Sequence, residues 1–130
     1  MRKFIGTFIA SLLVASCLIS AHATASPEPV IYDCGGAKQT RPTTIIVYCG
    51  DAGITVGSIV WTTWARKSAQ GNGIQYTKLC VPNCAEGGVA SRPVSIRLYK
   101  IVGGAFTRIT LSGAGGVTSY QLTGASPHHR

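Results

Sequence analysis

Residues 92–111 read RPVSIRLYKIVGGAFTRITL, and this stretch decides the fold. After Pro93, apolar and polar side chains alternate from Val94 to Tyr99, which is the period of a β-strand with one buried face. Gly103-Gly104 then supplies a turn before a second alternating run over residues 106–111. The stretch therefore predicts an antiparallel hairpin.

Similar short runs recur in both directions from this hairpin, separated by turns such as Gly71-Asn72-Gly73. The run 54–64 also fits a helical period, but its Thr, Val and Ile content favours a strand. Some seven short strands joined by turns predict an all-β fold, a small antiparallel β-sandwich stapled by two disulfides. The other expected strands are residues 30–32, 43–49, 54–64, 74–80 and 117–122.

The chain begins with Met-Arg-Lys and an apolar run over residues 4–21, the pattern of a secretory signal peptide. Ala23-Thr24-Ala25 has the small-x-small form of a cleavage site, and Ala21-His22-Ala23 offers a second one. The expected organisation is a signal at 1–25, a single β domain at 26–122 and a flexible tail at 123–130. A transmembrane helix is the alternative for the apolar run, which is near the shortest length that spans a bilayer.

Cys17 lies inside this leader, in the sequence VASC (residues 14–17), which resembles a bacterial lipobox. Cleavage before Cys17 would leave a lipid-modified N-terminal cysteine and anchor the protein on the outer face of the cytoplasmic membrane. The apolar Leu18-Ile19 is unusual for the polar tether that follows such an anchor. We therefore expect a secreted protein, with lipidation at Cys17 as the alternative.

Four cysteines remain once residues 1–25 are removed, with 10 basic and 4 acidic side chains, so the remaining 105 residues carry a net charge of +6. An even number of cysteines in a small exported chain predicts two disulfides. Of the three possible pairings we expect Cys34–Cys49 and Cys80–Cys84, because sequence neighbours close first. In the chain-entropy model, closing a loop of about 15 residues contributes about 3 kcal/mol.

The sequence CVPNC at residues 80–84 raises the alternatives of a redox site, a metal site and a staple. A thioredoxin-like site has two residues between its cysteines, and a zinc site needs four ligands. Here three residues intervene, and Pro82 and Asn83 favour a turn. A structural disulfide is the preferred interpretation, and no metal or cofactor is expected. The stapled loop, residues 80–88, is either a pinned strand connection or an exposed recognition loop.

Trp61 and Trp64 are the two tryptophans of the chain, and their spacing places them on opposite faces of one strand. Trp64 falls in the apolar row of residues 54–64 and is expected in the core. Trp61 is the candidate for an exposed stacking surface, with packing under a loop as the alternative.

Basic residues recur on the predicted hairpin, where Arg97 and Lys100 lie on one strand and Arg108 on the next. Such a face either keeps a protein soluble or attracts anionic partners. With Trp61, these residues form the candidate binding surface, for anionic cell-envelope polymers, lipid headgroups or an extracellular protein, and nucleic acid is not expected. Further basic residues are Lys38, Arg41, Arg66, Lys67 and Lys78.

Catalysis is not expected, because the predicted domain contains no histidine. His22 leaves with the signal, and His128 and His129 stand in the tail, so a serine or cysteine nucleophile has no base. Asp51 and Glu86 fall in predicted loops and are the carboxylates left for a weak hydrolase.

Three short patterns follow one another in this chain: W-x-x-W at 61–64, A-x-G-x-G at 69–73 and C-x-P-x-C-A-x-G at 80–87. With the leader and the strand start at Arg92-Pro93-Val94, they resemble a group of small exported actinobacterial proteins of uncharacterised function. The resemblance covers about residues 30–100; it implies export and a small β fold, and it implies no activity. We thus expect a non-enzymatic protein that binds at the cell envelope or outside the cell, and the alternative is a small secreted inhibitor presenting the 80–88 loop.

Overall fold

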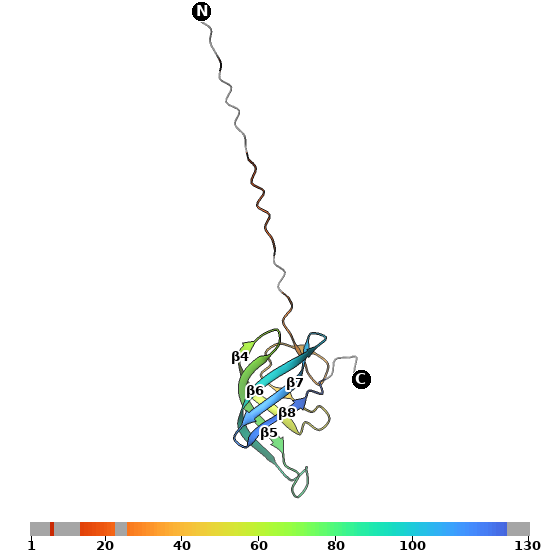
Figure 1. Ribbon diagram of the computed structural model, residues 1–130. Coiled ribbons are helices and arrows are strands. Elements are labelled where there is room, and N and C mark those ends of the chain that lie inside the picture. The colour runs from red at the N-terminus through yellow and green to blue at the C-terminus, as the bar shows by residue number, and fades with distance from the viewer. Residues whose placement is uncertain (1–5, 7–13, 23–25, 125–130) are drawn as a thin grey trace, which may run out of the picture.

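The computed structural model describes residues 6, 14–22 and 26–124 (Figure 1). The segment 14–22 is exposed and has no regular secondary structure, and Cys17 within it is a free thiol. The predicted cleavage site at 23–25 and the tail histidines His128 and His129 lie outside the described residues. Lipidation at Cys17 stays a prediction. Within the described part of the chain, no helix is long and apolar enough to cross a membrane.

The described residues form eight β-strands, in two antiparallel sheets. β3 to β8 form a six-stranded sheet in which each strand pairs with the next one along the chain, and β1 and β2 form a two-stranded sheet. The all-β prediction is therefore confirmed. The strands are β1 Ile31–Tyr32, β2 Lys38–Gln39, β3 Ile45–Ile46, β4 Ile54–Trp64, β5 Ala69–Lys78, β6 Val89–Val102, β7 Ala105–Gly113 and β8 Gly116–Gln121.

The core lies on one side of the six-stranded sheet, as the alternation in β6 predicts. Leu98 of β6 pairs in register with Ala69 of β5 and with Ile109 of β7, and all three side chains are buried. Ile96 and Leu111 form the next buried pair along the same two strands. Because side chains alternate between faces, the neighbours of these residues point outward to solvent.

The six-stranded sheet curls so far that its two ends meet (Figure 1). Thr123, which follows β8, donates from Oγ1 to the carbonyl of Val47 at 3.2 Å and accepts the N–H of Cys49 at 2.9 Å. The rings of Tyr48 and Tyr120 pack edge to face across the same junction, with centroids 5.8 Å apart. Thr123, the expected first residue of a flexible tail, is thus bonded to the sheet.

The predicted hairpin is present as β6 and β7. Gly103 and Gly104 have φ angles of 58° and 78°, which is the left-handed conformation that a two-residue turn of this kind requires. The turn places Val102 opposite Ala105, and this register continues along both strands to Tyr99 and Arg108. The run 54–64 is likewise a strand, β4, and not a helix.

The predicted turn at Gly71-Asn72-Gly73 is wrong, because these residues lie inside β5. The β4–β5 turn comes earlier, where the N–H of Ala65 donates to the carbonyl of Ser68 at 2.9 Å. A Cβ atom on Gly71 would stand 2.6 Å from the carbonyl oxygen of Val60 in β4. Glycine is therefore needed here for the close approach of two backbones and not for a turn.

Both disulfides have the expected pairing. Cys34–Cys49 joins the β1–β2 sheet to the chain after β3, with Cα atoms 5.4 Å apart. Cys80–Cys84 closes the loop between β5 and β6, with Cα atoms 3.8 Å apart. β6 starts at Val89, earlier than the run that the sequence predicts after Pro93, and Pro93 therefore lies inside this strand.

Candidate anion-binding face

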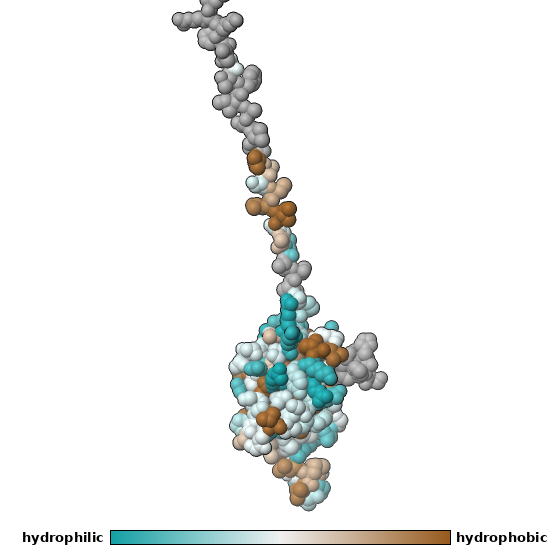
Figure 2. Space-filling view, viewed as in Figure 1, coloured by the Kyte–Doolittle hydropathy of each residue, from teal (hydrophilic) through white to brown (hydrophobic). Residues whose placement is uncertain are grey.

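The outer face of β6, β7 and β8 brings together five residues that we call the basic face: Arg97, Tyr99, Arg108, Thr110 and Ser119. They come from three neighbouring strands and lie close together because of the register. Arg97 pairs with Thr110, which pairs with Ser119, and Tyr99 pairs with Arg108. Figure 2 shows hydrophilic side chains gathered over the upper part of the face that these strands form in Figure 1.

Tyr99 lies at the centre of the basic face. The guanidinium carbon of Arg97 stands 5.1 Å from the centre of the Tyr99 ring, a distance that allows a cation–π contact. Hydrogen bonds to the hydroxyls of Ser119 and then Thr110, together with the positive charges of Arg108 and Arg97, hold the pKa of Tyr99 below its usual range. The Thr110 and Ser119 hydroxyls are themselves 2.8 Å apart.

The positive charge of the basic face has no acidic counterpart on the sheet. The strands β4 to β8 contain no Asp or Glu at all. Glu28 is paired with Arg41, whereas the Asp33 and Asp51 carboxylates accept backbone N–H groups in their own turns. Glu86 is in the loop before β6, and the length of β6 from its start at Val89 to Arg97 is about 26 Å. The charges that the basic face itself carries are therefore all positive.

Lys100 follows Tyr99 at the same end of β6. It is exposed, and its backbone has a φ angle of 56°, an uncommon conformation for a residue other than glycine. Its carbonyl accepts the hydroxyl of Thr107 at 2.8 Å, which holds the strand in this conformation. The structure therefore places two of the four predicted surface residues, Arg97 and Arg108, on one face, and Lys100 at the end of the same strand as Arg97.

Trp61, the fourth predicted residue, lies elsewhere. It pairs with Gly71, which pairs with the buried Ile96, so it belongs to the inner side of the sheet and is only half-buried. The prediction that Trp61 and Trp64 face opposite sides is wrong, because their rings pack edge to face with centroids 4.9 Å apart. A break in the β4–β5 register between Trp61 and Thr63 reverses the alternation and brings the two indoles together.

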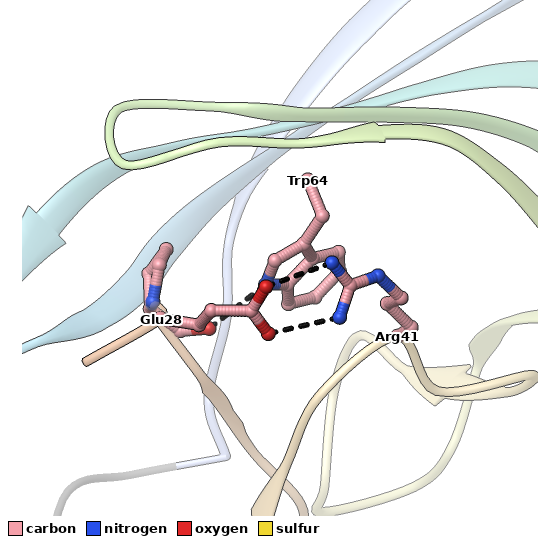
Figure 3. Close-up of polar contacts among 4 residues, drawn as sticks. Glu28, Arg41 and Trp64 are labelled. Carbon is pink, nitrogen blue, oxygen red and sulfur yellow. Dashed lines mark hydrogen bonds and ion pairs between the residues drawn. The ribbon is translucent and has the colours of Figure 1, made fainter. Parts of the chain in front are cut away.

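The two indoles bind the part of the chain that precedes β4, and Figure 3 shows Trp64 with Glu28 and Arg41. The Trp64 Nε1–H donates to the carbonyl of Pro29 at 2.9 Å, and the Trp61 Nε1–H donates to that of Pro42 at 2.8 Å. Arg41 stands over the Trp64 ring and binds Glu28 through two hydrogen bonds of 2.9 Å each. These bonds lower the pKa of the Glu28 carboxyl and raise that of Arg41. The guanidinium of Arg41 thus has an anionic partner within the chain, whereas the arginines of the basic face have none among the described residues.

The stapled 80–88 loop projects from the opposite end of the molecule (Figure 1). Its tip is exposed, with 84% of the Val81 surface accessible. The Asn83 side chain accepts the N–H groups of Ala85 and Glu86 at 3.0 Å each, which orders the tip. A Cβ on Gly87 would collide with the Leu79 carbonyl, so the base of the loop is closely packed. Cys80 and Cys84 are joined as a disulfide, as preferred over a redox or metal site.

The two carboxylates considered for a weak hydrolase belong to separate turns. Asp51 accepts the N–H of Gly53 at 2.8 Å in the β3–β4 connection, and Glu86 lies in the 80–88 loop. Among the described residues, no hydrogen bond links the two side chains to each other or to a nucleophile. A hollow of about 340 Å³ between β1–β2 and β3 has Asp33 on its wall, and that carboxylate already accepts hydrogen bonds from the N–H groups of Gly35 and Ala37 and from the side chain of Gln39.

Tyr99, Thr110 and Ser119 were not among the predicted site residues. Tyr99 was detectable, because it shares a strand face with Arg97, and a two-residue turn at Gly103-Gly104 places it opposite Arg108. Thr110 and Ser119 carry no comparable signal in the sequence.

In comparisons with known proteins, no family model, no curated protein and no solved structure matches this chain.

Proposed function

We propose that this protein is an exported, non-enzymatic binding protein that holds anionic polymers of the cell envelope on its basic face. The observation that carries the proposal is the pair of arginines around Tyr99, on a sheet whose strands β4 to β8 have no acidic residue. Rigid strands hold these charges at fixed spacing, which suits repeated anionic groups better than a flexible basic tail does. No histidine lies in the described β domain, which supports binding over catalysis.

Three features support export. The leader over residues 1–25 has the composition of a secretory signal, and the resemblance to small exported actinobacterial proteins implies the same destination. The two disulfides suit an oxidising compartment outside the cytoplasm. Anionic polymers of the envelope are the abundant partners that such a protein would meet.

The proposal predicts salt-sensitive retention on isolated bacterial cell wall. Replacing Arg97 and Arg108 together by alanine is expected to weaken retention about 10- to 100-fold, because two charge-assisted contacts are lost. Retention is measured as the fraction bound at increasing salt. The bound fraction of the wild type falls steeply, whereas that of the variant is low from the start and changes little.

The matched control is Lys38→Ala with Lys78→Ala, which removes the same charge from other strands. This control is expected to retain most of the wild-type binding. Equal loss in both double variants would mean that only net charge matters. Retention that neither salt nor the Arg97→Ala, Arg108→Ala change reduces would overturn the proposal.

A second candidate is a small secreted inhibitor that presents the 80–88 loop to an extracellular protease. The projecting, exposed and internally bonded tip around Asn83 favours it, because a pre-ordered loop loses little entropy on binding. The expected result is inhibition by the native protein that weakens about tenfold or more in Cys80→Ser with Cys84→Ser. Residual protease activity is measured against protein concentration, and no inhibition across a panel of extracellular proteases would contradict this candidate.

A further inference from the structure

Three hydroxyl groups converge on the basic face. Tyr99 of β6 has its hydroxyl near those of Thr110 in β7 and Ser119 in β8. The Thr110 and Ser119 hydroxyls are hydrogen-bonded to each other at 2.8 Å. Because each hydroxyl has one proton, two of the three can donate outward while this bond is kept.

Two guanidinium groups flank this cluster without an acceptor of their own. Within the described chain, Arg41 is bonded to Glu28, and Arg92 is bonded to Gln75 and to the carbonyl of Ala114. Arg97 and Arg108 have no such hydrogen bond to any described residue, and each carries five N–H donors. The cluster therefore has many donors and lacks an acceptor group with negative charge.

The arrangement of the donors indicates the shape of the missing acceptor. They come from three strands, which are spaced about 4.8 Å apart, and one of them, Arg97, stands over the Tyr99 ring. A flat carboxylate is satisfied by one guanidinium fork, whereas a phosphate group accepts hydrogen bonds on several oxygens around a tetrahedron. A phosphate uses both arginines and the hydroxyls at once.

We infer that the basic face contains a phosphate subsite in which Arg97 and Arg108 bind the oxygens of a phosphate group and the hydroxyls of Tyr99, Thr110 and Ser119 orient it. This inference rests on the proposed function and names its ligand class. Two kinds of molecule could supply this phosphate group: a phosphodiester polymer of the cell wall and a phospholipid headgroup. Arginines supply most of the attraction, and the hydroxyl cluster supplies the selectivity for phosphate over other anions.

Tyr99 also supplies a local signal of binding. Its pKa is lowered because hydrogen bonds and the two arginine charges favour the phenolate. A bound phosphate neutralises those charges and takes over part of the hydrogen bonding, so the pKa of Tyr99 rises on binding. The change is read from the phenolate absorbance of the wild-type chain minus that of Tyr99→Phe, because the chain has five tyrosines.

The test uses the whole chain and inorganic phosphate, at constant ionic strength with chloride as the reference. Phosphate is expected to raise the Tyr99 pKa and to shift backbone amide resonances around residues 97–99, 108–110 and 119. Tyr99→Phe is expected to weaken phosphate binding about fivefold, the effect of one lost hydrogen bond. The matched control, Tyr76→Phe, alters another tyrosine, which is 39% exposed on β5, and leaves the affinity unchanged.

The two proposals fail in different ways. Amide shifts scattered over the surface, with equal affinity in Tyr99→Phe and Tyr76→Phe, would overturn the subsite, even if wall retention still depends on Arg97 and Arg108. Retention independent of the arginines would overturn the proposed function itself. Binding to poly(glycerol phosphate) without binding to phosphatidylglycerol vesicles identifies the polymer as the source. Binding to those vesicles, but not to phosphatidylcholine vesicles, identifies the headgroup.

Discussion

Leu98→Ala is expected to lower the free energy of unfolding by about 2–5 kcal/mol, one of the largest effects of any single change in this protein. Leu98 has no accessible surface and stands between Ala69 and Ile109 in the middle of the curled sheet. The neighbouring strands are held by their hydrogen bonds, so they cannot collapse fully into the cavity that the substitution leaves. A domain of this size is stabilised by only about 5–15 kcal/mol, so the loss is a large part of the total.

The measurement is urea unfolding followed by tryptophan fluorescence, because Trp61 and Trp64 pack against the same core. Leu79→Ala is the matched control, since it makes the same chemical change at a side chain that is 43% exposed beside the 80–88 loop. The control is expected to cost less than about 1 kcal/mol. Equal losses at the two leucines would contradict the placement of the core.

The alternation of residues was enough to predict the central hairpin and its core. From the two-residue turn at Gly103-Gly104, simple counting sets Tyr99 opposite Arg108, which is the register observed. The position of Ser119 opposite Thr110 could not be predicted in the same way. The β7–β8 connection lies in a run of small residues, 112–116, where the sequence permits several turn positions and therefore several registers.

The tryptophan pair shows where the pattern of a single strand stops being informative. Alternation places Trp61 and Trp64 on opposite faces only while the strand stays regular. The register of β4 shifts twice, between Gly57 and Val60 and between Trp61 and Thr63, and Ser58 takes a φ angle of 50°. These bulges depend on contacts with β5 and with the N-terminal segment, which no local sequence signal contains.

Glycine was misread at Gly71 for a related physical reason. A turn and a close backbone approach both require the absence of a side chain, so the sequence alone does not distinguish them. Here the carbonyl of Val60 takes the space that a Cβ would occupy. The ion pair of Glu28 and Arg41 is a further long-range feature, because 13 residues separate the partners and only the folded chain brings them together.

Loss of the Cys34–Cys49 disulfide is expected to lower the free energy of unfolding by about 3 kcal/mol, and loss of Cys80–Cys84 by about 2 kcal/mol. The difference follows from loop length, since the two bonds span 15 and 4 residues respectively. Cys49 also donates its N–H to Thr123 at the junction where the sheet closes, so its release loosens that junction. The Cys80–Cys84 loop projects from the sheet and closes no such contact.

The experiment compares Cys34→Ser with Cys49→Ser against Cys80→Ser with Cys84→Ser, both by urea unfolding and by amide exchange. The first variant is expected to show faster exchange at the Val47 and Thr123 junction, whereas the second is expected to change exchange only near its own loop. A greater loss of stability in the second variant would contradict this account. The comparison therefore separates the disulfide that holds the closing junction of the sheet from the one that shapes only the 80–88 loop.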